Sequence, residues 1–419
     1  MSSFVTHLEA AIDGTRLDHR RLQTLHADRP LVVRYDLDAI RSTVDRARIE
    51  AREPTMWRYR ELLPVEEKEN IVSLGEGMSP LIRAPRLARE LGLEELLIKD
   101  ESQLPTGSFK SRGLSMAVSR AKELGVERLA IPTAGNAGGA LAAYAARAGL
   151  EAFVFLPADA PCVSVGEAQL LGAHVYRIDG LITDCAAIVA AGKEVMKWFD
   201  LSTLKEPYRI EGKKTMGLEL AEQLGWRLPD AIFYPTGGGT GLIGMWKAFA
   251  ELEALGWLED TKRPRMYACQ SATCDPIVRA FDAGERHAEE VQDAQTLASG
   301  IRVPRAIGDF MILDAVRESG GAACRAGEEE LIHWMERCCE LEGISLCPEA
   351  GACLSSIAEL LRAGKLSADA STVVFNTGAV QKYIELLPPP PPEIKDAAAI
   401  DWKQLKAQAS RNHSFSSSR

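Results

Sequence analysis

The fold of this chain is decided by residues 106–113, Thr-Gly-Ser-Phe-Lys-Ser-Arg-Gly, which place a lysine at the turn between a strand and a helix. The apolar run Leu96-Leu97-Ile98 before this stretch predicts a buried strand. Ser108 can cap the helix that follows. One face of that helix is apolar, because four small or aliphatic residues recur at helical spacing: Leu114, Ala117, Val118 and Ala121. The pattern therefore predicts a strand, a turn and a helix, with Lys110 at the start of the helix.

The position of Lys110 favours reactive chemistry. The positive end of a helix disfavours an ammonium ion and helps to make a nucleophilic amine near neutral pH. Such an amine can form a Schiff base with a carbonyl compound. An isolated lysine in a first helical turn is more often a solvated surface residue, so this interpretation depends on two glycine-rich turns further along the chain.

The first glycine-rich turn is residues 133–139, Thr-Ala-Gly-Asn-Ala-Gly-Gly. It follows an apolar strand, residues 129–131, and opens an alanine-rich helix, residues 141–148. Small residues let a planar ligand approach the backbone. Asn136 can then bond a ring hydroxyl, while backbone N–H groups beside it hold a carboxylate. Thr133 and Gly135 are the candidate substrate-binding residues of this turn.

The second turn is residues 236–241, Thr-Gly-Gly-Gly-Thr-Gly, between the apolar strand 231–234 and a helix through Met245, Trp246 and Phe249. Successive glycine N–H groups at a helix N-terminus make a cradle for phosphate. Single glycine runs are weak signals, because many merely turn the chain. A reactive lysine, an asparagine turn and a phosphate turn in this order are far more specific.

From about Trp57 to Tyr383 the chain resembles the fold-type II pyridoxal-phosphate enzymes, and within them the threonine synthases. Besides the three turns above, the matching segments are residues 75–81 (Gly-Glu-Gly-Met-Ser-Pro-Leu), residues 206–215 (Glu-Pro-Tyr-Arg-Ile-Glu-Gly-Lys-Lys-Thr) and residues 375–378 (Phe-Asn-Thr-Gly). The resemblance implies that Lys110 carries pyridoxal 5'-phosphate as a Schiff base. It also implies that Asn136 faces the ring oxygen of the cofactor and that Thr377 faces the pyridine nitrogen. The cofactor phosphate would be held by Gly237, Gly238, Gly239 and Thr240.

Arg209 distinguishes the possible reactions better than these cofactor residues do. The cofactor phosphate already has a glycine cradle, so a nearby basic cluster, Arg209, Lys213 and Lys214, is available for another anion. The resemblance implies that Arg209 grips the phosphate of the substrate O-phosphohomoserine, which suits a guanidinium fork, and Lys213 is a candidate second contact. The alternative is a basic surface turn paired with Glu206 and Glu211.

We therefore predict a carbon-oxygen lyase of threonine biosynthesis that converts O-phospho-L-homoserine and water to L-threonine and phosphate, by γ-elimination and β-addition of water. One alternative is a serine or threonine dehydratase, or another β-eliminating or β-replacing enzyme of the superfamily, which would need no grip on a substrate phosphate. A second is a non-catalytic relative that serves as an interaction protein. The exact substrate stays open, because Ala134, Ala137 and Ser111 depart from the residues frequent in threonine synthases.

Composition is consistent with a soluble enzyme. The chain has 419 residues, a formal charge of -10 and a sequence pI near 5.4, which argue against nucleic acid as a partner. No apolar run is long enough to span a membrane, and the start has no hydrophobic signal core. The nine cysteines form no CxxC motif, and we predict no metal site. We expect a cytoplasmic homodimer that acts on a small phosphorylated amino acid.

Glu349 lies in a helix-opening turn, Pro348-Glu349-Ala350-Gly351. In the superfamily this turn lies near the cofactor ring, so Glu349 could contact the active site. A glutamate in a first helical turn also stabilises the helix dipole, and the sequence leaves both interpretations open.

Apolar strands alternate with helical segments through most of the chain, which predicts parallel α/β structure with both sheet faces covered. By the resemblance, two such domains enclose the cofactor in the cleft between them. Residues 57–112 and 209–386 would form the larger domain, and residues 113–208 the smaller one inserted in it. Related bacterial synthases often begin with a small cysteine-rich element that resembles a zinc ribbon, but residues 1–56 contain no cysteine. We expect helical packing or a partly ordered arm there. Residues 387–419 read as a proline-rich, flexible tail, with a short docking helix at 400–409.

Overall fold

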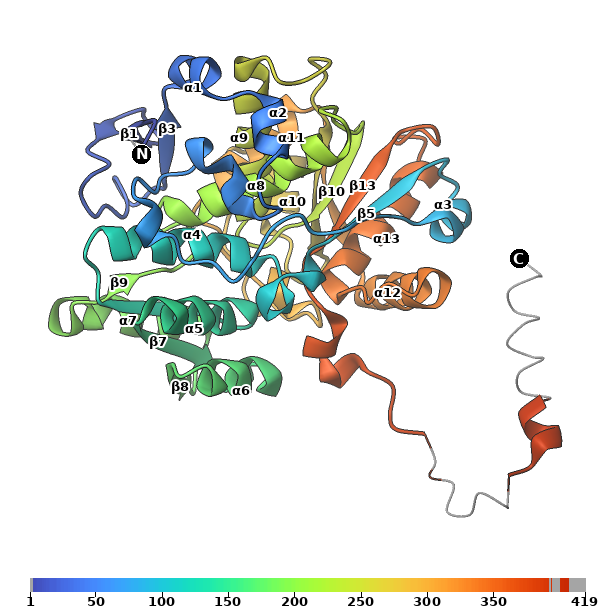
Figure 1. Ribbon diagram of the computed structural model, residues 1–419. Helices are drawn as coiled ribbons and strands as arrows, with labels where there is room; N and C mark the ends of the chain where they lie inside the picture. Colours follow the sequence, from blue (N-terminus) through green and yellow to red (C-terminus); the bar gives the residue numbers. More distant parts are fainter. Residues whose placement is uncertain (1–2, 392, 394–399, 407–419) are drawn as a thin grey trace. The chain divides into compact units, whose positions relative to one another are not determined.

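The structure is a computed structural model of the 419-residue chain and describes every residue except 1–2, 392, 394–399 and 407–419 (Figure 1). Contacts divide the chain into two compact units, residues 1–384 and residues 385–419. Among the described residues, the first unit contains three β-sheets and the helices that cover them. This unit holds all the site residues expected from the sequence.

The largest sheet supplies most of the site. In spatial order its six strands are β12 (Ala322–Ala326), β11 (Arg265–Ser271), β10 (Ala231–Pro235), β13 (Thr372–Asn376), β5 (Leu96–Asp100) and β4 (Leu81–Arg83). All neighbours pair in parallel except β4, which runs antiparallel to β5 at one edge. The central strands β10 and β13 are buried along their whole length, as the predicted apolar runs require.

Helices cover both faces of this sheet. α13 packs against β10 to β13, whereas α9 and α11 pack on each other over the opposite face (Figure 1). The core is continuous on the α9 face, because Leu242, Met245 and Phe249 pack against Ile232 and Met266. The helices of this part are α3 (Pro85–Leu91), α8 (Tyr208–Gln223), α9 (Thr240–Leu255), α10 (Pro276–Asp282), α11 (Asp309–Glu318), α12 (Glu328–Glu342) and α13 (Pro348–Arg362).

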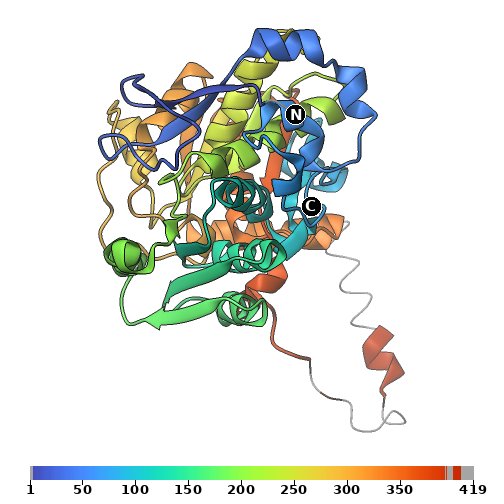
Figure 2. The same cartoon turned by 60° about the vertical axis from the view of Figure 1, so that its left-hand side comes forward.

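A second, four-stranded parallel sheet is formed by residues 128–200 (Figure 2). Its order is β8 (His174–Ile178), β7 (Glu151–Pro157), β6 (Arg128–Pro132) and β9 (Phe199–Asp200). The associated helices are α4 (Lys110–Glu123), α5 (Asn136–Ala148), α6 (Cys162–Leu170) and α7 (Ile182–Met196). We propose residues 113–208 as the inserted lobe, because this sheet falls wholly inside them.

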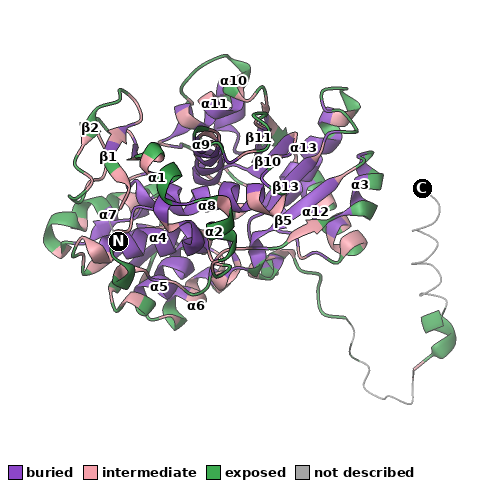
Figure 3. Cartoon of the chain, turned by 45° about the horizontal axis from the view of Figure 1, so that its top comes forward, coloured by how far each residue is buried: buried purple, intermediate pink, exposed green. Residues whose placement is uncertain are grey.

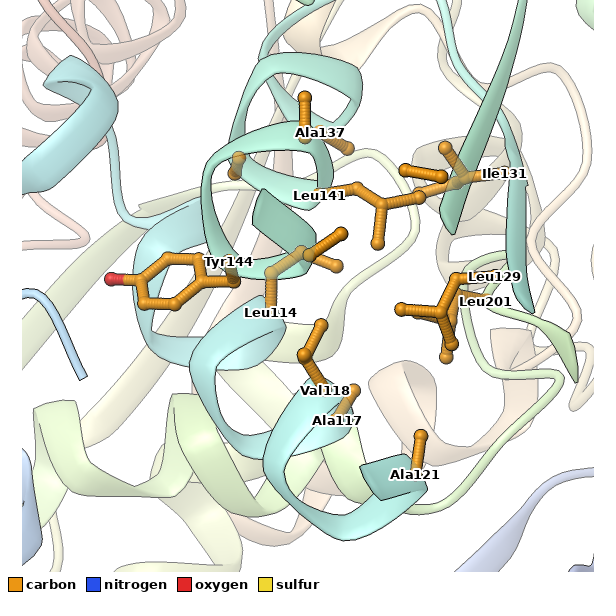
Figure 4. Close-up of a cluster of buried hydrophobic side chains, with 14 of the residues drawn as sticks. Leu114, Ala117, Val118, Ala121, Leu129, Ile131, Ala137, Leu141, Tyr144 and Leu201 are labelled. Carbon is orange, nitrogen blue, oxygen red and sulfur yellow. The ribbon is translucent and has the colours of Figure 1, made fainter. Parts of the chain in front are cut away.

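The apolar face of α4 is confirmed. Figure 4 shows its side chains directed toward α5 and the strands of the small sheet. The whole stripe is removed from solvent: Leu114, Ala117, Val118 and Ala121 are each 0% exposed. Burial of this kind contributes roughly 0.8 kcal/mol per buried methylene group, so the stripe fixes the helix that begins at Lys110.

The predicted parallel α/β architecture is therefore confirmed, although the sequence missed some strands. β12 reads Ala-Ala-Cys-Arg-Ala and lacks the branched residues that mark strands, while β4 and β9 are very short. Figure 3 shows the buried strands and α8 at the centre, with exposed residues at the periphery. No helix among the described residues has the length and apolar character needed to cross a bilayer.

The expectation of helical packing or a loose arm at the N-terminus is wrong for residues 5–35. These residues form an antiparallel sheet in the order β2 (Arg16–Leu17), β1 (Val5–Ala10) and β3 (Leu31–Tyr35). Alternate side chains make a small core, because Leu8 and Ala10 meet Leu31 and Val33. Helices follow only at α1 (Leu37–Thr43), α2 (Arg46–Glu50) and the 3₁₀ turns η1 (Met56–Leu62) and η2 (Lys68–Asn70).

Short 3₁₀ turns complete the described structure: η3 (Glu101–Gln103), η4 (Pro105–Gly107), η5 (Ser299–Ile301), η6 (Val380–Lys382) and η7 (Ile384–Leu386). In the second unit, residues 402–406 are helical. The expected docking helix, residues 400–409, and the expected flexible tail, residues 387–419, lie partly outside the described residues.

Candidate active site

A cavity lies where the carboxyl ends of β5, β10 and β13 meet the start of α5. Its empty space, including the open mouth, is about 740 Å³. The wall comes from separate segments: Phe109 and Lys110, Gly135 and Asn136, the turn 237–241, the turn 299–303, Glu349, and Thr377 with Lys382 and Tyr383. Open α/β sheets bind ligands at this end of their strands. Most of the residues expected at the site are thus brought to one place.

Lys110 is the first residue of α4 and lines the cavity. Burial first, and then the positive charge of Arg209, lower the pKa of its amine to about 7, against the opposing charge of Glu349. A neutral, nucleophilic amine is therefore accessible near neutral pH, as expected. The main cause differs from the expected one, because burial and a neighbouring cation dominate.

The predicted cap on α4 is wrong. The N-cap is Phe109, without a side-chain hydrogen bond, and the buried Ser108 hydroxyl has no partner among the described atoms. Ser108 is extended and forms a bridge with Gly378 instead. The N–H of Phe109 also donates to the carbonyl of Thr377 at 3.1 Å. The lysine turn is thus held by the end of β13.

Arg209 and Lys213 are buried beside Lys110. Arg209 donates from Nη1 to the carbonyl of Leu201 at 2.7 Å, while its Nε has no partner among the described atoms. Lys213 donates to the carbonyl of Phe109, and its Nζ lies 3.9 Å from the centre of the Phe109 ring. Burial, then Lys110 and Arg209, lowers the pKa of Lys213 well below its usual value.

The alternative of a surface turn paired with glutamates applies to Lys214 alone, and even there the pair is buried. Lys214 lies 2.7 Å from Glu211 and 2.8 Å from Glu251, with all three side chains largely removed from solvent. Glu206 instead accepts from the backbone N–H groups of Tyr208 and Arg209 at 2.7 and 3.0 Å. The basic segment therefore divides between a structural lysine and two cations near the site.

The asparagine turn meets the cavity at Gly135 and Asn136. Asn136 begins α5, and its Nδ2 lies near Gly378, where an added Cβ would approach it to 3.4 Å. Thr133 is outside the cavity wall. Its hydroxyl is 3.1 Å from both the carbonyl and the N–H of Gly135, so it shapes the turn.

The glycine turn requires glycines for lack of space. A Cβ on Gly237 would meet Val303 at 2.8 Å, and one on Gly238 would meet Thr203 at 2.7 Å. Gly239 has φ +74°, which favours glycine. α9 begins at Thr240 without a side-chain cap, so the turn offers backbone N–H donors and the positive helix end to the cavity.

Thr377 lies at the end of β13 and lines the cavity. Its Oγ1 is 3.6 Å from the sulfur of buried Cys347. A hydroxyl at this position can serve a ring nitrogen, and being neutral it stabilises a pyridinium less than a carboxylate would.

Several cavity residues were missed or left open by the sequence. Glu349 is one, since its Oε1 accepts from the N–H of Gly300 at 2.7 Å and from the hydroxyl of Tyr383 at 2.6 Å. Tyr234 also lines the wall, at the end of the strand before the glycine turn. A polar residue at a strand end beside a ligand turn was the available signal for Tyr234. No local signal marks Tyr383.

Two ion pairs join the small lobe to the rest of the site. Lys382, which lines the cavity, lies 2.7 Å from Glu167 on α6. Arg302, which follows η5, lies 3.4 Å from Asp159 after β7. Both pairs link residues within 113–208 to segments that follow them in the chain.

The residues present fit pyridoxal 5'-phosphate. The cavity combines a lysine amine of lowered pKa, a capless helix start with glycines that cannot carry a Cβ, an amide at Asn136 and a hydroxyl at Thr377. An aldehyde, a phosphate, a ring hydroxyl and a ring nitrogen would each meet a suitable group.

Comparison with known proteins agrees with this chemistry. Residues 72–378 match the family model described as pyridoxal-phosphate dependent enzyme. The threonine synthase of Methanocaldococcus jannaschii is 34% identical over 349 residues, 83% of this chain and 85% of that protein. The chain belongs to the threonine synthase family. The threonine synthase of Methanosarcina acetivorans is 35% identical over 353 residues, 84% of this chain and 85% of that protein.

Solved structures show the same fold at greater distance. Maize serine racemase has a TM-score of 0.62 and 21% identity, covering 80% of this chain and 93% of its own. Threonine deaminase isoform 2 from Solanum lycopersicum has a TM-score of 0.62 and 18% identity, covering 74% of this chain and 82% of its own. The threonine synthase family member described here is thus a fold-type II pyridoxal-phosphate enzyme and a lyase.

Proposed function

We propose that this protein converts O-phospho-L-homoserine and water to L-threonine and phosphate, with Arg209 and Lys213 as the site for the substrate phosphate. The observation that carries the proposal is the pair of buried cations beside Lys110, neither of which has a carboxylate within ion-pair distance among the described residues. A buried cation without a counter-charge is costly even when it donates to carbonyl groups, and a phosphate dianion would supply the counter-charge.

The remaining site residues are assigned to the cofactor. Bound pyridoxal 5'-phosphate would supply an electron sink that eases proton loss from the α and β carbons of the substrate. Lys110 would hold the cofactor through its amine and, as a free amine, would move protons at those carbons. Asn136 orients the ring, Thr377 contacts its nitrogen, and Gly237, Gly238, Gly239 and Thr240 bind its phosphate.

Substrate orientation falls to the asparagine turn and the basic pair. Thr133 holds Gly135 in position, so that backbone N–H groups at the start of α5 bind the substrate carboxylate. Arg209 is not itself part of the cavity wall, but Thr203 is, and the Oγ1 of Thr203 lies 3.5 Å from Nη1 of Arg209. Binding at both ends of the substrate would align the bond to be broken with the cofactor.

The test compares substrates and variants of cofactor-loaded enzyme. O-phospho-L-homoserine should yield equimolar phosphate and L-threonine, whereas L-serine and L-threonine should yield little 2-oxo acid. Arg209→Ala should lower kcat/KM for the phosphorylated substrate by about 10²-fold, given the 1.5–3 kcal/mol of hydrogen bonds to charged groups. Arg89→Ala, on the exposed side of α3, is the control.

Formation of 2-oxo acid from the hydroxyamino acids, without turnover of O-phospho-L-homoserine, would instead assign a dehydratase. The homodimeric state and the cytoplasmic location remain part of the proposal. Light scattering on the purified enzyme tests the first, and fractionation of the source cells tests the second.

A further inference from the structure

Glu349 is the one carboxylate among the described residues that line the cavity. It stands in the first turn of α13, and only 2% of its surface is exposed. Its negative charge acts on Lys110, whose pKa it raises against the effects of burial and Arg209. Glu349 is therefore close to the amine at which the substrate must react.

The two carboxylate oxygens of Glu349 differ in their hydrogen bonding. Oε1 accepts two hydrogen bonds, from Gly300 at 2.7 Å and from Tyr383 at 2.6 Å, which fix the orientation of the side chain. Oε2 is buried and has no hydrogen-bond partner among the described atoms. Buried carboxylate oxygens are nearly always bonded, so an unpartnered one beside a ligand cavity indicates a donor that arrives with the ligand.

The groups around Glu349 do not compete for this role. Burial and the charge of Glu349 raise the pKa of the Cys347 thiol and of the Tyr383 phenol, so both stay protonated and accept no proton. The ammonium of Lys382 is paired with Glu167 at 2.7 Å. The amine of Lys110 would be occupied in holding the cofactor when the substrate enters. Glu349 is thus the available proton acceptor.

We propose that Glu349 accepts the proton that the α-ammonium group of the substrate must lose before its nitrogen can replace that of Lys110. An N–H bond of the ammonium breaks, its electron pair stays on nitrogen, and an O–H bond forms at Oε2. The neutral carboxyl returns the proton when the product amine departs. The inference rests on the proposed function only in requiring amine exchange at Lys110.

The test uses Glu349→Gln, which retains Oε1 as the acceptor for Gly300 and Tyr383 but cannot take a proton at the other position. Cofactor-loaded enzyme is mixed rapidly with L-threonine, or with methoxyamine, and the visible absorbance of the cofactor is followed. Methoxyamine is already unprotonated at neutral pH and needs no acceptor. The variant should react about 10²-fold more slowly with L-threonine and at the wild-type rate with methoxyamine.

Raising the pH should restore the rate of Glu349→Gln with L-threonine, because the free amine then becomes abundant. Glu329→Gln removes an exposed carboxylate from the first turn of α12 and should match the wild type with both amines. Equal slowing with both amines, or slowing with neither, would overturn the role of Glu349. Failure of the wild type to respond to L-threonine, while it responds to methoxyamine, would overturn the proposed function and the inference together.

Discussion

Two clusters of buried charge lie side by side on α4 and α8 and follow opposite rules. In the paired cluster, Arg112 donates to both oxygens of Glu101 at 2.6 and 2.8 Å and to Glu219 at 2.7 Å, and Lys99 donates to Glu219. All four side chains are 0% exposed. The unpaired cluster, Lys110, Arg209 and Lys213, has no carboxylate within ion-pair distance among the described residues, although Glu349 acts on Lys110 and Glu206 and Asp200 act on Arg209 from further away.

The presence or absence of a paired carboxylate distinguishes a structural residue, Arg112, from a site residue, Lys110, only two positions away in the sequence. Buried ions that are paired in good geometry fix how elements meet, and Arg112 ties α4 to η3 and α8. Buried cations without a paired carboxylate either lose their proton more easily or are stabilised when an anionic ligand binds. Lys110 and Arg112 are neighbours on the same helix, yet one belongs to the site and the other to its support.

The largest effect is expected at Lys110. Lys110→Ala should lower turnover by more than about 10³-fold, because both the covalent attachment and the proton carrier are lost. Phosphate release gives the turnover, and borohydride reduction followed by peptide mass measurement locates the attachment. Lys122→Ala, on the same helix, should leave both unchanged. A cofactor still covalently bound in Lys110→Ala would contradict the assignment.

The next effect concerns the paired cluster. Glu219→Gln leaves Lys99 and Arg112 with one fewer counter-charge in a dry environment, so the free energy of unfolding should fall by about 3–5 kcal/mol. Urea unfolding followed by tryptophan fluorescence measures it. Glu151→Gln, which removes half of an exposed pair with Arg128, should change little. If Glu219→Gln changed the free energy of unfolding as little as Glu151→Gln, the paired cluster would not have the structural role given to it here.

A change in the unpaired cluster should act in the opposite direction on stability. Lys213→Met removes a buried cation whose pKa is already lowered by burial and by Lys110, so the apoenzyme should gain roughly 1 kcal/mol. Turnover of O-phospho-L-homoserine should fall at the same time. Loss of stability in the apoenzyme would mean that Lys213 is structural after all.

The last effect is on the pH dependence of apoenzyme stability. The pKa of Lys110 is about 7 in the folded protein, and its ordinary value, 10.5, applies to the unfolded chain. At pH values between the two, the unfolded chain therefore binds more protons than the folded protein. Lys110 therefore destabilises the fold fully below about pH 7, and the penalty fades as the pH rises toward about 10. Lys110→Met should be more stable than wild type at about pH 6, where the buried amine of the wild type carries its charge. Melting curves at several pH values should converge at high pH.

Local patterns carried most of what could be predicted from the sequence. The turns at Lys110, Asn136 and Gly237 follow apolar strands, and parallel strands place their carboxyl ends together, so these residues reach one cavity. The same logic placed Thr377 at the end of β13.

Contacts between residues distant in the chain could not be predicted from the sequence. Glu349 is positioned by Gly300 and Tyr383, which are distant in the chain. For Arg209, the alternative of a surface turn stayed open because the burial of α8 depends on such contacts. Ser108 was expected to cap α4 because serine is a common cap, but the bridge to Gly378 takes its backbone elsewhere.

The two ion pairs between the small lobe and the rest of the site have a consequence for substrate entry. Asp159 is 64% exposed and Arg302 is 24% exposed, whereas Lys382 and Glu167 are 12% and 18% exposed. Pairs that water reaches are screened as ionic strength rises, with a Debye length near 8 Å at about 0.15 M salt. The more exposed pair, Asp159 and Arg302, should therefore weaken first as salt is added. Salt should then change the rates at which ligands enter and leave the site more than the rate of the chemical step.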